Sequence, residues 1–111
     1  MNERGRKYLA DILLAIELID EFISDISNFA DYQIDLKTKS AVERQLGIIG
    51  EAVNQFRREN SGVELSHTRQ VVNFRNRLIH SYDNIDDSIV WTIVKRHLPI
   101  LKAEIEQRLA E

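Results

Sequence analysis

The chain has 111 residues, of which 43% are hydrophobic and 30% charged, and these values are typical of one globular domain spanning residues 1–111. It contains no cysteine, so disulfides, thiolate metal sites and a cysteine nucleophile are excluded. No apolar run approaches the roughly 20 residues that span a bilayer, and the charged N-terminus is unlike a signal peptide. We therefore expect a cytoplasmic protein with no membrane partner.

The net charge of −3 argues weakly against a nucleic-acid partner, but the charge is unevenly distributed. Residues 57–80 contain five arginines and two acidic residues, which is a local net charge of 5 − 2 = +3. Screening limits the reach of distant charges to about 10 Å. This stretch can therefore attract phosphate although the whole chain is acidic.

Apolar residues recur at steps of three and four over most of the chain, which predicts an all-α fold, a bundle of four to five helices. The predicted helices span about residues 3–27, 38–59 and 67–82, and a last helix runs to about Leu109. Ser66 is a plausible N-cap of the third helix, and Asp86 or Asp87 of the last. Pro99 should kink the last helix or split it near His97.

Two helices carry unusual residues. Gly47 and Gly50 lie inside the second predicted helix, where each costs about 1 kcal/mol relative to alanine, and this spacing indicates a close approach of another helix. In the third, Arg75 falls near the middle of the apolar face, and Asn76 and His80 are neighbours on another flank with Arg69 and Asn73. That apolar face consists of Val71, Val72, Leu78, Ile79 and Tyr82.

An arginine within an apolar face needs a partner, because an unpaired buried charge is strongly unfavourable. Glu51 is the preferred carboxylate and Asp20 an alternative, and for Arg75 such a structural ion pair and a catalytic role stay equally open. From the residues alone, His80 reads as a surface histidine and Tyr82 as a core residue with its hydroxyl at the rim.

A metal site formed by His80, Asp83 and Asp86 is a further alternative. These residues would straddle a helix end and a turn, whereas metal sites need a defined geometry. His67 and His97 have no acidic residue at ligand spacing. The chain also has no phosphate-binding glycine loop, GxSxG or HExxH motif, which excludes most enzyme classes. We expect neither a metal nor a cofactor.

The segment RNRLIHSY resembles the R-X4-H-X-Y motif of HEPN-domain proteins and is most similar to that of the HepT toxins. Arg75, Asn76, His80 and Tyr82 occupy the motif positions. YLADILLAIELIDEF resembles the first helix of the family, and VERQLGIIGEAVN, which contains Glu51, resembles the second. VWTIVKRHLPILKAEI resembles the last helix, including its proline. The resemblance covers essentially the whole chain.

This resemblance implies a homodimer in which the motifs of both subunits meet in a cleft. It implies a metal-independent endoribonuclease, with RNA and not DNA as substrate, acting as the toxin of a toxin–antitoxin pair. The implied partner is a minimal (MNT-type) nucleotidyltransferase antitoxin that neutralises the toxin by adding AMP to Tyr82. The alternative is a non-catalytic HEPN module that only binds a nucleotidyltransferase.

The residue types suit RNA cleavage without a metal. Histidine changes its charge near neutral pH, so two copies of His80 could act as base and acid. Arg75 would bind the scissile phosphate, while Asn76 and Glu51 would support the site. On an ideal helix Arg75 and His80 lie about 140° apart around the axis. A second subunit would resolve this separation.

Overall fold

The computed structural model describes residues 1–80 and 85–111, and every regular element within these ranges is helical. The helices are α1 (Glu3–Phe22), α2 (Phe29–Ile34), α3 (Leu36–Glu59), α4 (Arg69–His80), α5 (Asp87–Thr92), the π-helix η1 (Ile93–His97) and α6 (Leu98–Ala110). The predicted all-α bundle is confirmed. None of the described helices is long and apolar enough to cross a membrane.

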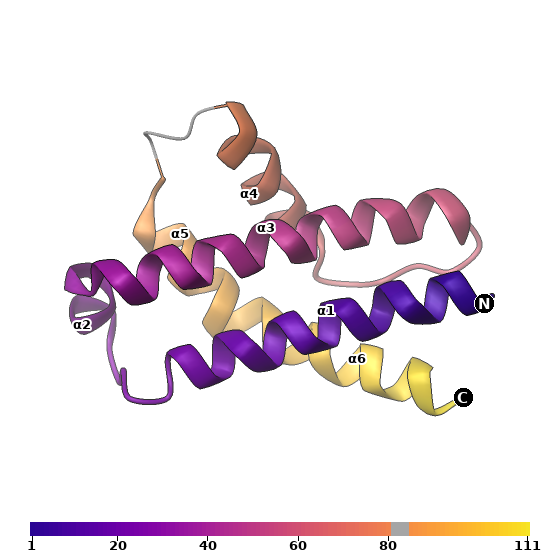
Figure 1. Cartoon of the computed structure of the whole chain (residues 1–111), viewed down its shortest axis with the longest axis horizontal. Coiled ribbons are helices and arrows are strands. Elements are labelled where there is room, and N and C mark those ends of the chain that lie inside the picture. The colour runs from indigo at the N-terminus through magenta and orange to yellow at the C-terminus, as the bar shows by residue number, and fades with distance from the viewer. Residues whose placement is uncertain (81–84) are drawn as a thin grey trace.

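The centre of the fold is the pair formed by α1 and α3, which run side by side in opposite directions (Figure 1). α6 packs against α1, and α4 packs against α3. Apolar side chains of α1, α3, η1 and α6 meet in one core, because burying them releases water from apolar surface. Its fully buried members include Leu9, Ile12, Ile19, Leu46, Ile49, Phe56, Ile93, Leu101 and Ile105.

The first connection differs from the prediction. α1 ends at Phe22, not at residue 27, and the short helix α2 follows with only Tyr32 buried. Asn28 caps α2 by accepting a hydrogen bond from the Asp31 amide at 2.9 Å. Six residues with one buried side chain leave too little periodicity to predict a helix.

The predicted N-cap of α4 is wrong. The amide and hydroxyl of Ser66 both donate to the Glu104 carboxylate, the amide at 3.0 Å. His67 has a φ of 58°, in the left-handed region, so a helix cannot begin there. The first helical hydrogen bond runs from the Val72 amide to the Thr68 carbonyl. α4 therefore starts two residues later than predicted.

The last helical segment shows the break expected near His97. Asp86 caps α5 by accepting a hydrogen bond from the Ser88 amide at 2.9 Å, as predicted. The chain then passes through η1, where the Leu98 amide donates to the Ile93 carbonyl five residues earlier. Pro99 follows directly, and its lack of an amide hydrogen costs nothing in the first turn of α6.

Candidate active site

Two glycines of α3 determine how closely α4 approaches. A Cβ atom on Gly50 would lie 2.5 Å from the Cβ of Arg75 and 3.0 Å from the Val71 carbonyl oxygen. A Cβ on Gly47 would lie 3.2 Å from a methyl group of Leu78. The predicted close approach is therefore confirmed, and it rests the stem of Arg75 directly on the backbone of α3.

The face that α4 turns to the core differs in part from the predicted one. Val71 and Phe74 are its buried residues, whereas the side chain of Ile79 is 57% exposed. The close contact at Gly50 explains this, because it directs the Val71–Phe74 edge inward and leaves Ile79 outside. Arg75 lies at the boundary, with 27% of its side chain exposed.

Arg75 forms the predicted ion pair with Glu51, between Nη2 and Oε2. Its Nη1 also donates to the Oδ1 atom of Asn76 at 3.2 Å. Gln55 supports the carboxylate, because its amide donates to Glu51 Oε1 at 3.0 Å. The alternative partner is wrong, since the Asp20 carboxylate lies 3.5 Å from Lys102. These contacts hold the guanidinium in one orientation.

This ion pair is not deeply buried, because 42% of the Glu51 side chain is exposed. A guanidinium has five N–H donors, and the two described contacts occupy only part of them. Arg75 can therefore bind an additional anion from the solvent side while Glu51 holds it in place.

His80 is the last residue of α4, and its side chain is exposed. It makes no side-chain hydrogen bond or ion pair with any other described residue. α4 is a regular helix from Arg69 to His80, so the separation of about 140° between Arg75 and His80 around the axis holds. One subunit does not bring these two side chains to a single point.

Part of the predicted site lies outside the described residues, namely Tyr82 and Asp83. The position of the motif tyrosine and the metal site that includes Asp83 are therefore left as predictions. Among residues 1–80 and 85–111, no group of three or more histidine, cysteine or acidic side chains could hold a metal ion.

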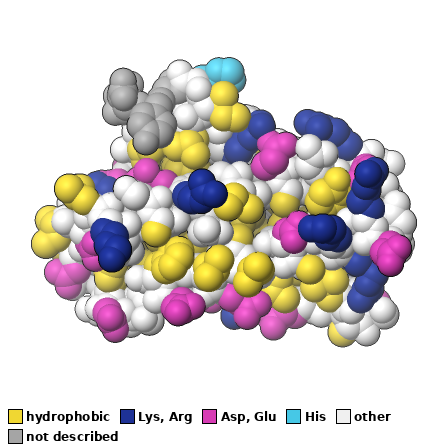
Figure 2. Space-filling model, viewed as in Figure 1, with side chains coloured by type: hydrophobic (Ala, Val, Ile, Leu, Met, Phe, Trp, Pro, Cys, Tyr) yellow, Lys and Arg dark blue, Asp and Glu magenta, His cyan; other side chains and the backbone are white. Residues whose placement is uncertain are grey.

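An open groove of about 910 Å³ adjoins the Arg75–Glu51 pair on the face formed by α1 and α3. Glu51 and Leu78 lie at its α4 end, and Leu14 and Ile48 are among its apolar lining residues. Leu14 is 59% exposed and Ile48 38%. Figure 2 shows apolar side chains gathered along this face between acidic and basic ones.

The structure also brings together two histidines that the sequence does not connect. The Nδ1 atoms of His67 and His97 lie 3.1 Å apart. The two residues are 30 positions apart and lie on different elements. No local spacing could therefore have indicated this contact.

The protein is thus a helical bundle that carries a fixed arginine and an exposed histidine on one helix. Comparison with known families identifies the class of protein to which it belongs. Residues 12–108 match the family described as Ribonuclease HepT-like. This match covers most of the chain, so the protein belongs to the HepT-like ribonuclease family.

Individual relatives agree with this assignment. The chain is 40% identical to a protein of Thermococcus cleftensis named "Probable ribonuclease HepT", with 96% of this chain and 97% of the relative covered. It is 37% identical to "Putative RNase MJ1380" of Methanocaldococcus jannaschii, with 96% and 98% covered. No solved structure was found to match the chain.

Proposed function

We propose that this protein is a metal-independent endoribonuclease and the toxin of a toxin–antitoxin pair, with Arg75 and His80 as its catalytic residues. The observation that carries the proposal is the arginine held by Glu51 and Asn76 on the same helix as an exposed histidine. Both occur in a member of the HepT-like ribonuclease family. Such a pair supplies the positive charge and the proton transfer that RNA cleavage requires.

In the proposed reaction the ribose 2′-oxygen attacks the adjacent phosphorus, and the bond from phosphorus to the 5′-oxygen breaks. One imidazole takes the proton of the 2′-hydroxyl, and an imidazolium protonates the leaving 5′-oxygen. Arg75 stabilises the extra negative charge on the phosphorane through charge-assisted hydrogen bonds. The products are a 2′,3′-cyclic phosphate and a 5′-hydroxyl, and no metal takes part.

The proposed enzyme is a homodimer, because base and acid then come from the His80 side chains of two subunits. The groove beside Glu51 and Leu78 supports this, since exposed apolar side chains such as Leu14 and Ile48 favour contact with another protein surface. Light scattering at micromolar concentration should give the mass of two chains. A monomer would contradict this part of the proposal.

The proposed antitoxin is an MNT-type nucleotidyltransferase that transfers AMP from ATP to the Tyr82 hydroxyl and releases pyrophosphate. Tyr82 is two positions beyond His80 in the sequence, so the modification adds bulk and negative charge close to the motif. Incubation with such an enzyme and ATP should raise the intact mass by one AMP group, and Tyr82→Phe should prevent the increase. An unchanged mass of the wild-type chain would contradict it.

The decisive experiment is a cleavage assay with total cellular RNA in the presence of EDTA. We expect wild-type cleavage and at least about a 100-fold loss in His80→Ala, with a similar loss in Arg75→Ala. Lys37→Ala removes an exposed cation outside the basic stretch and is the matched control, and thermal unfolding checks that each variant is folded.

Cleavage by His80→Ala at the wild-type rate would contradict the catalytic assignment, and abolition by EDTA would contradict metal independence. A folded chain that leaves RNA intact and carries no AMP, as shown by its intact mass, would favour the non-catalytic HEPN module.

A further inference from the structure

The contact between His67 and His97 is a head-on imidazole pair. Their ring centroids are 5.4 Å apart, only 2.3 Å more than the 3.1 Å between the Nδ1 atoms (5.4 − 3.1). This difference is about twice the distance from a ring nitrogen to the centre of its own ring, so the two nitrogens face each other directly. One ring therefore donates its N–H to the other, and both Nε2 atoms remain outside the contact.

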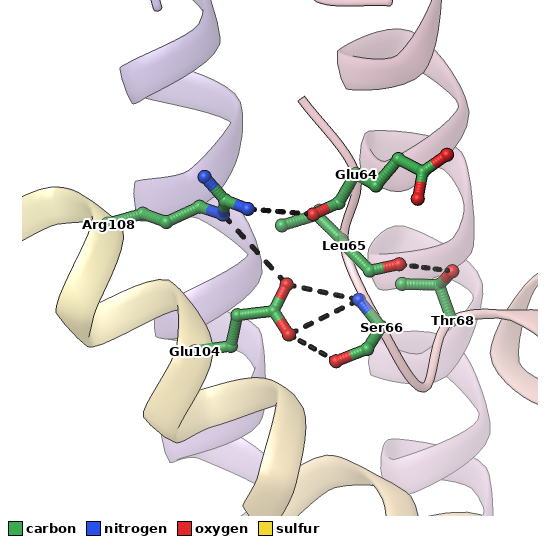
Figure 3. A network of polar contacts seen from close by, with 6 residues as sticks. All are labelled: Glu64, Leu65, Ser66, Thr68, Glu104 and Arg108. Atoms are coloured by element: carbon green, nitrogen blue, oxygen red, sulfur yellow. Dashed lines mark hydrogen bonds and ion pairs between the residues drawn. The ribbon is translucent and has the colours of Figure 1, made fainter. Parts of the chain in front are cut away.

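The loop that carries His67 is fixed to α6, as Figure 3 shows. Glu104 accepts hydrogen bonds from the amide and hydroxyl of Ser66, and Arg108 donates to the Glu64 carbonyl at 2.9 Å. His67 is thereby held in a left-handed conformation, which histidine adopts more readily than most residues. The histidine pair is thus part of a defined structure.

Around this pair lies a shallow pocket of about 420 Å³, and its charged lining residues, Arg57 and Arg69, are cationic. Arg57, Arg69, His67 and His97 line it, and its described lining residues include no carboxylate. Arg57 is held by the buried Thr68, to whose hydroxyl it donates. Arg69 is exposed and forms no ion pair with any carboxylate in the described parts of the chain. The nearby Glu104 carboxylate accepts hydrogen bonds from the amide and hydroxyl of Ser66.

A polar stripe on α4 connects this pocket with the candidate active site. It consists of Arg69, Asn73, Asn76 and His80, which occupy one flank of the helix and are all exposed. The 12 residues from Arg69 to His80 are separated by eleven helical rises, which span about 16 Å along the axis. α4 contains no acidic residue. The stripe is long enough to follow several successive phosphates of a single strand.

We propose that Arg57, Arg69 and the His67–His97 pair form a phosphate-binding subsite for single-stranded RNA, and that this proposal rests on the proposed ribonuclease function. The strand runs along the stripe of α4, so that binding one phosphate in the pocket positions a distant one at His80. Arginine suits this role because its planar group forms bidentate hydrogen bonds to phosphate. The imidazole N–H groups add further donors.

The test is fluorescence anisotropy with a labelled, random-sequence 2′-O-methyl RNA of about 12 nucleotides, which lacks the attacking hydroxyl and cannot be cleaved. Arg69→Gln should raise Kd about 3- to 10-fold, and the slope of log K against log salt should fall by about 0.7 for each lost phosphate contact. Lys37→Gln is the control, because it removes one exposed charge that is remote from α4. Lys37 lies 13 residues, or about 20 Å along α3, from Gly50, where α3 contacts α4.

Two further variants address the histidines. His67→Asn removes the imidazole and keeps a residue that tolerates the left-handed conformation. His97→Gln removes the partner ring. Each should weaken binding at least about 2-fold at low salt, with an unchanged melting temperature as the check on folding.

The outcomes separate the two proposals. Equal affinities and salt slopes for Arg69→Gln and Lys37→Gln would overturn the subsite, as would the absence of RNA binding by the wild-type chain. If cleavage is still lost in His80→Ala, the ribonuclease assignment stands without the subsite. Weakened binding in the pocket variants of a chain that cleaves no RNA would support the subsite and overturn the enzyme.

Discussion

α1 and α4 are both amphipathic helices, but they contribute to different properties of the molecule. α1 buries six of its 20 residues, between Gly5 and Ile19, in the core. α4 buries two of its 12, Val71 and Phe74, and leaves a flank of polar and cationic side chains exposed. α1 therefore provides stability, whereas α4 presents chemical groups on a support that α3 provides. A helix can carry a site when one edge is packed closely enough to fix its position and the opposite flank stays exposed.

The largest expected effect tests this difference between α1 and α4 by replacing one isoleucine of each helix with alanine. Ile12 is fully buried in α1, so Ile12→Ala should lower the free energy of unfolding by about 2–5 kcal/mol. Ile79 in α4 is 57% exposed, and Ile79→Ala should change it by no more than about 0.5 kcal/mol. Urea denaturation measures both. A loss at Ile79 as large as at Ile12 would show that Ile79 also belongs to the buried face of α4.

The contact that fixes α4 can be tested at Gly50. Gly50→Ala places a methyl group 2.5 Å from the Cβ of Arg75, so α4 must shift, at a cost of about 1–3 kcal/mol. Because Arg75 moves with α4, RNA cleavage should also fall. The measurements are urea denaturation and the cleavage assay.

Gly62→Ala is the matched control. A Cβ on Gly62 would meet no atom within 4 Å, and its φ is not positive. It should change stability and cleavage little. If Gly50→Ala were equally silent, the close approach of α3 and α4 would not position Arg75.

Features that depend on local periodicity were predictable from the sequence. The helical periodicity gave the bundle, the two glycines indicated the approach of α4, and Glu51 was identified as the partner of Arg75. In each case one helix carries a repeated pattern or an uncommon residue whose physical requirement is narrow, such as a charge that needs a counter-charge.

Contacts between distant segments were not predictable where no buried charge or helix-interior glycine indicated them. Serine is a residue type that favours N-caps, but the amide of Ser66 donates to the carboxylate of Glu104, 38 residues away. The His67–His97 contact arises because the loop before α4 reaches the end of η1. Helical periodicity also placed Ile79 inside, since it does not show which edge of an amphipathic face a glycine brings closest.

The smallest expected effect lies away from α4, at Glu43 of α3. Its carboxyl is half-buried, and burial is the main cause that raises its pKa, with a further contribution from the negative charge of Asp87. Lys39 acts in the opposite direction, and it forms an ion pair with Asp87 at 2.7 Å. The folded state thus holds the proton of Glu43 more tightly than the unfolded state does.

The sign of the pH effect follows from this direction. A raised pKa contributes stability that is complete below the unfolded pKa and is lost as pH rises through the folded pKa. At pH 7 the charged Glu43 therefore lowers stability, and Glu43→Gln should raise the free energy of unfolding by less than about 1 kcal/mol after screening. The gain should vanish as pH falls below the unfolded pKa, because wild-type Glu43 is then protonated in both states. Glu17→Gln on the exposed side of α1 should show no such gain, and an equal gain there would assign the effect to net charge instead of burial.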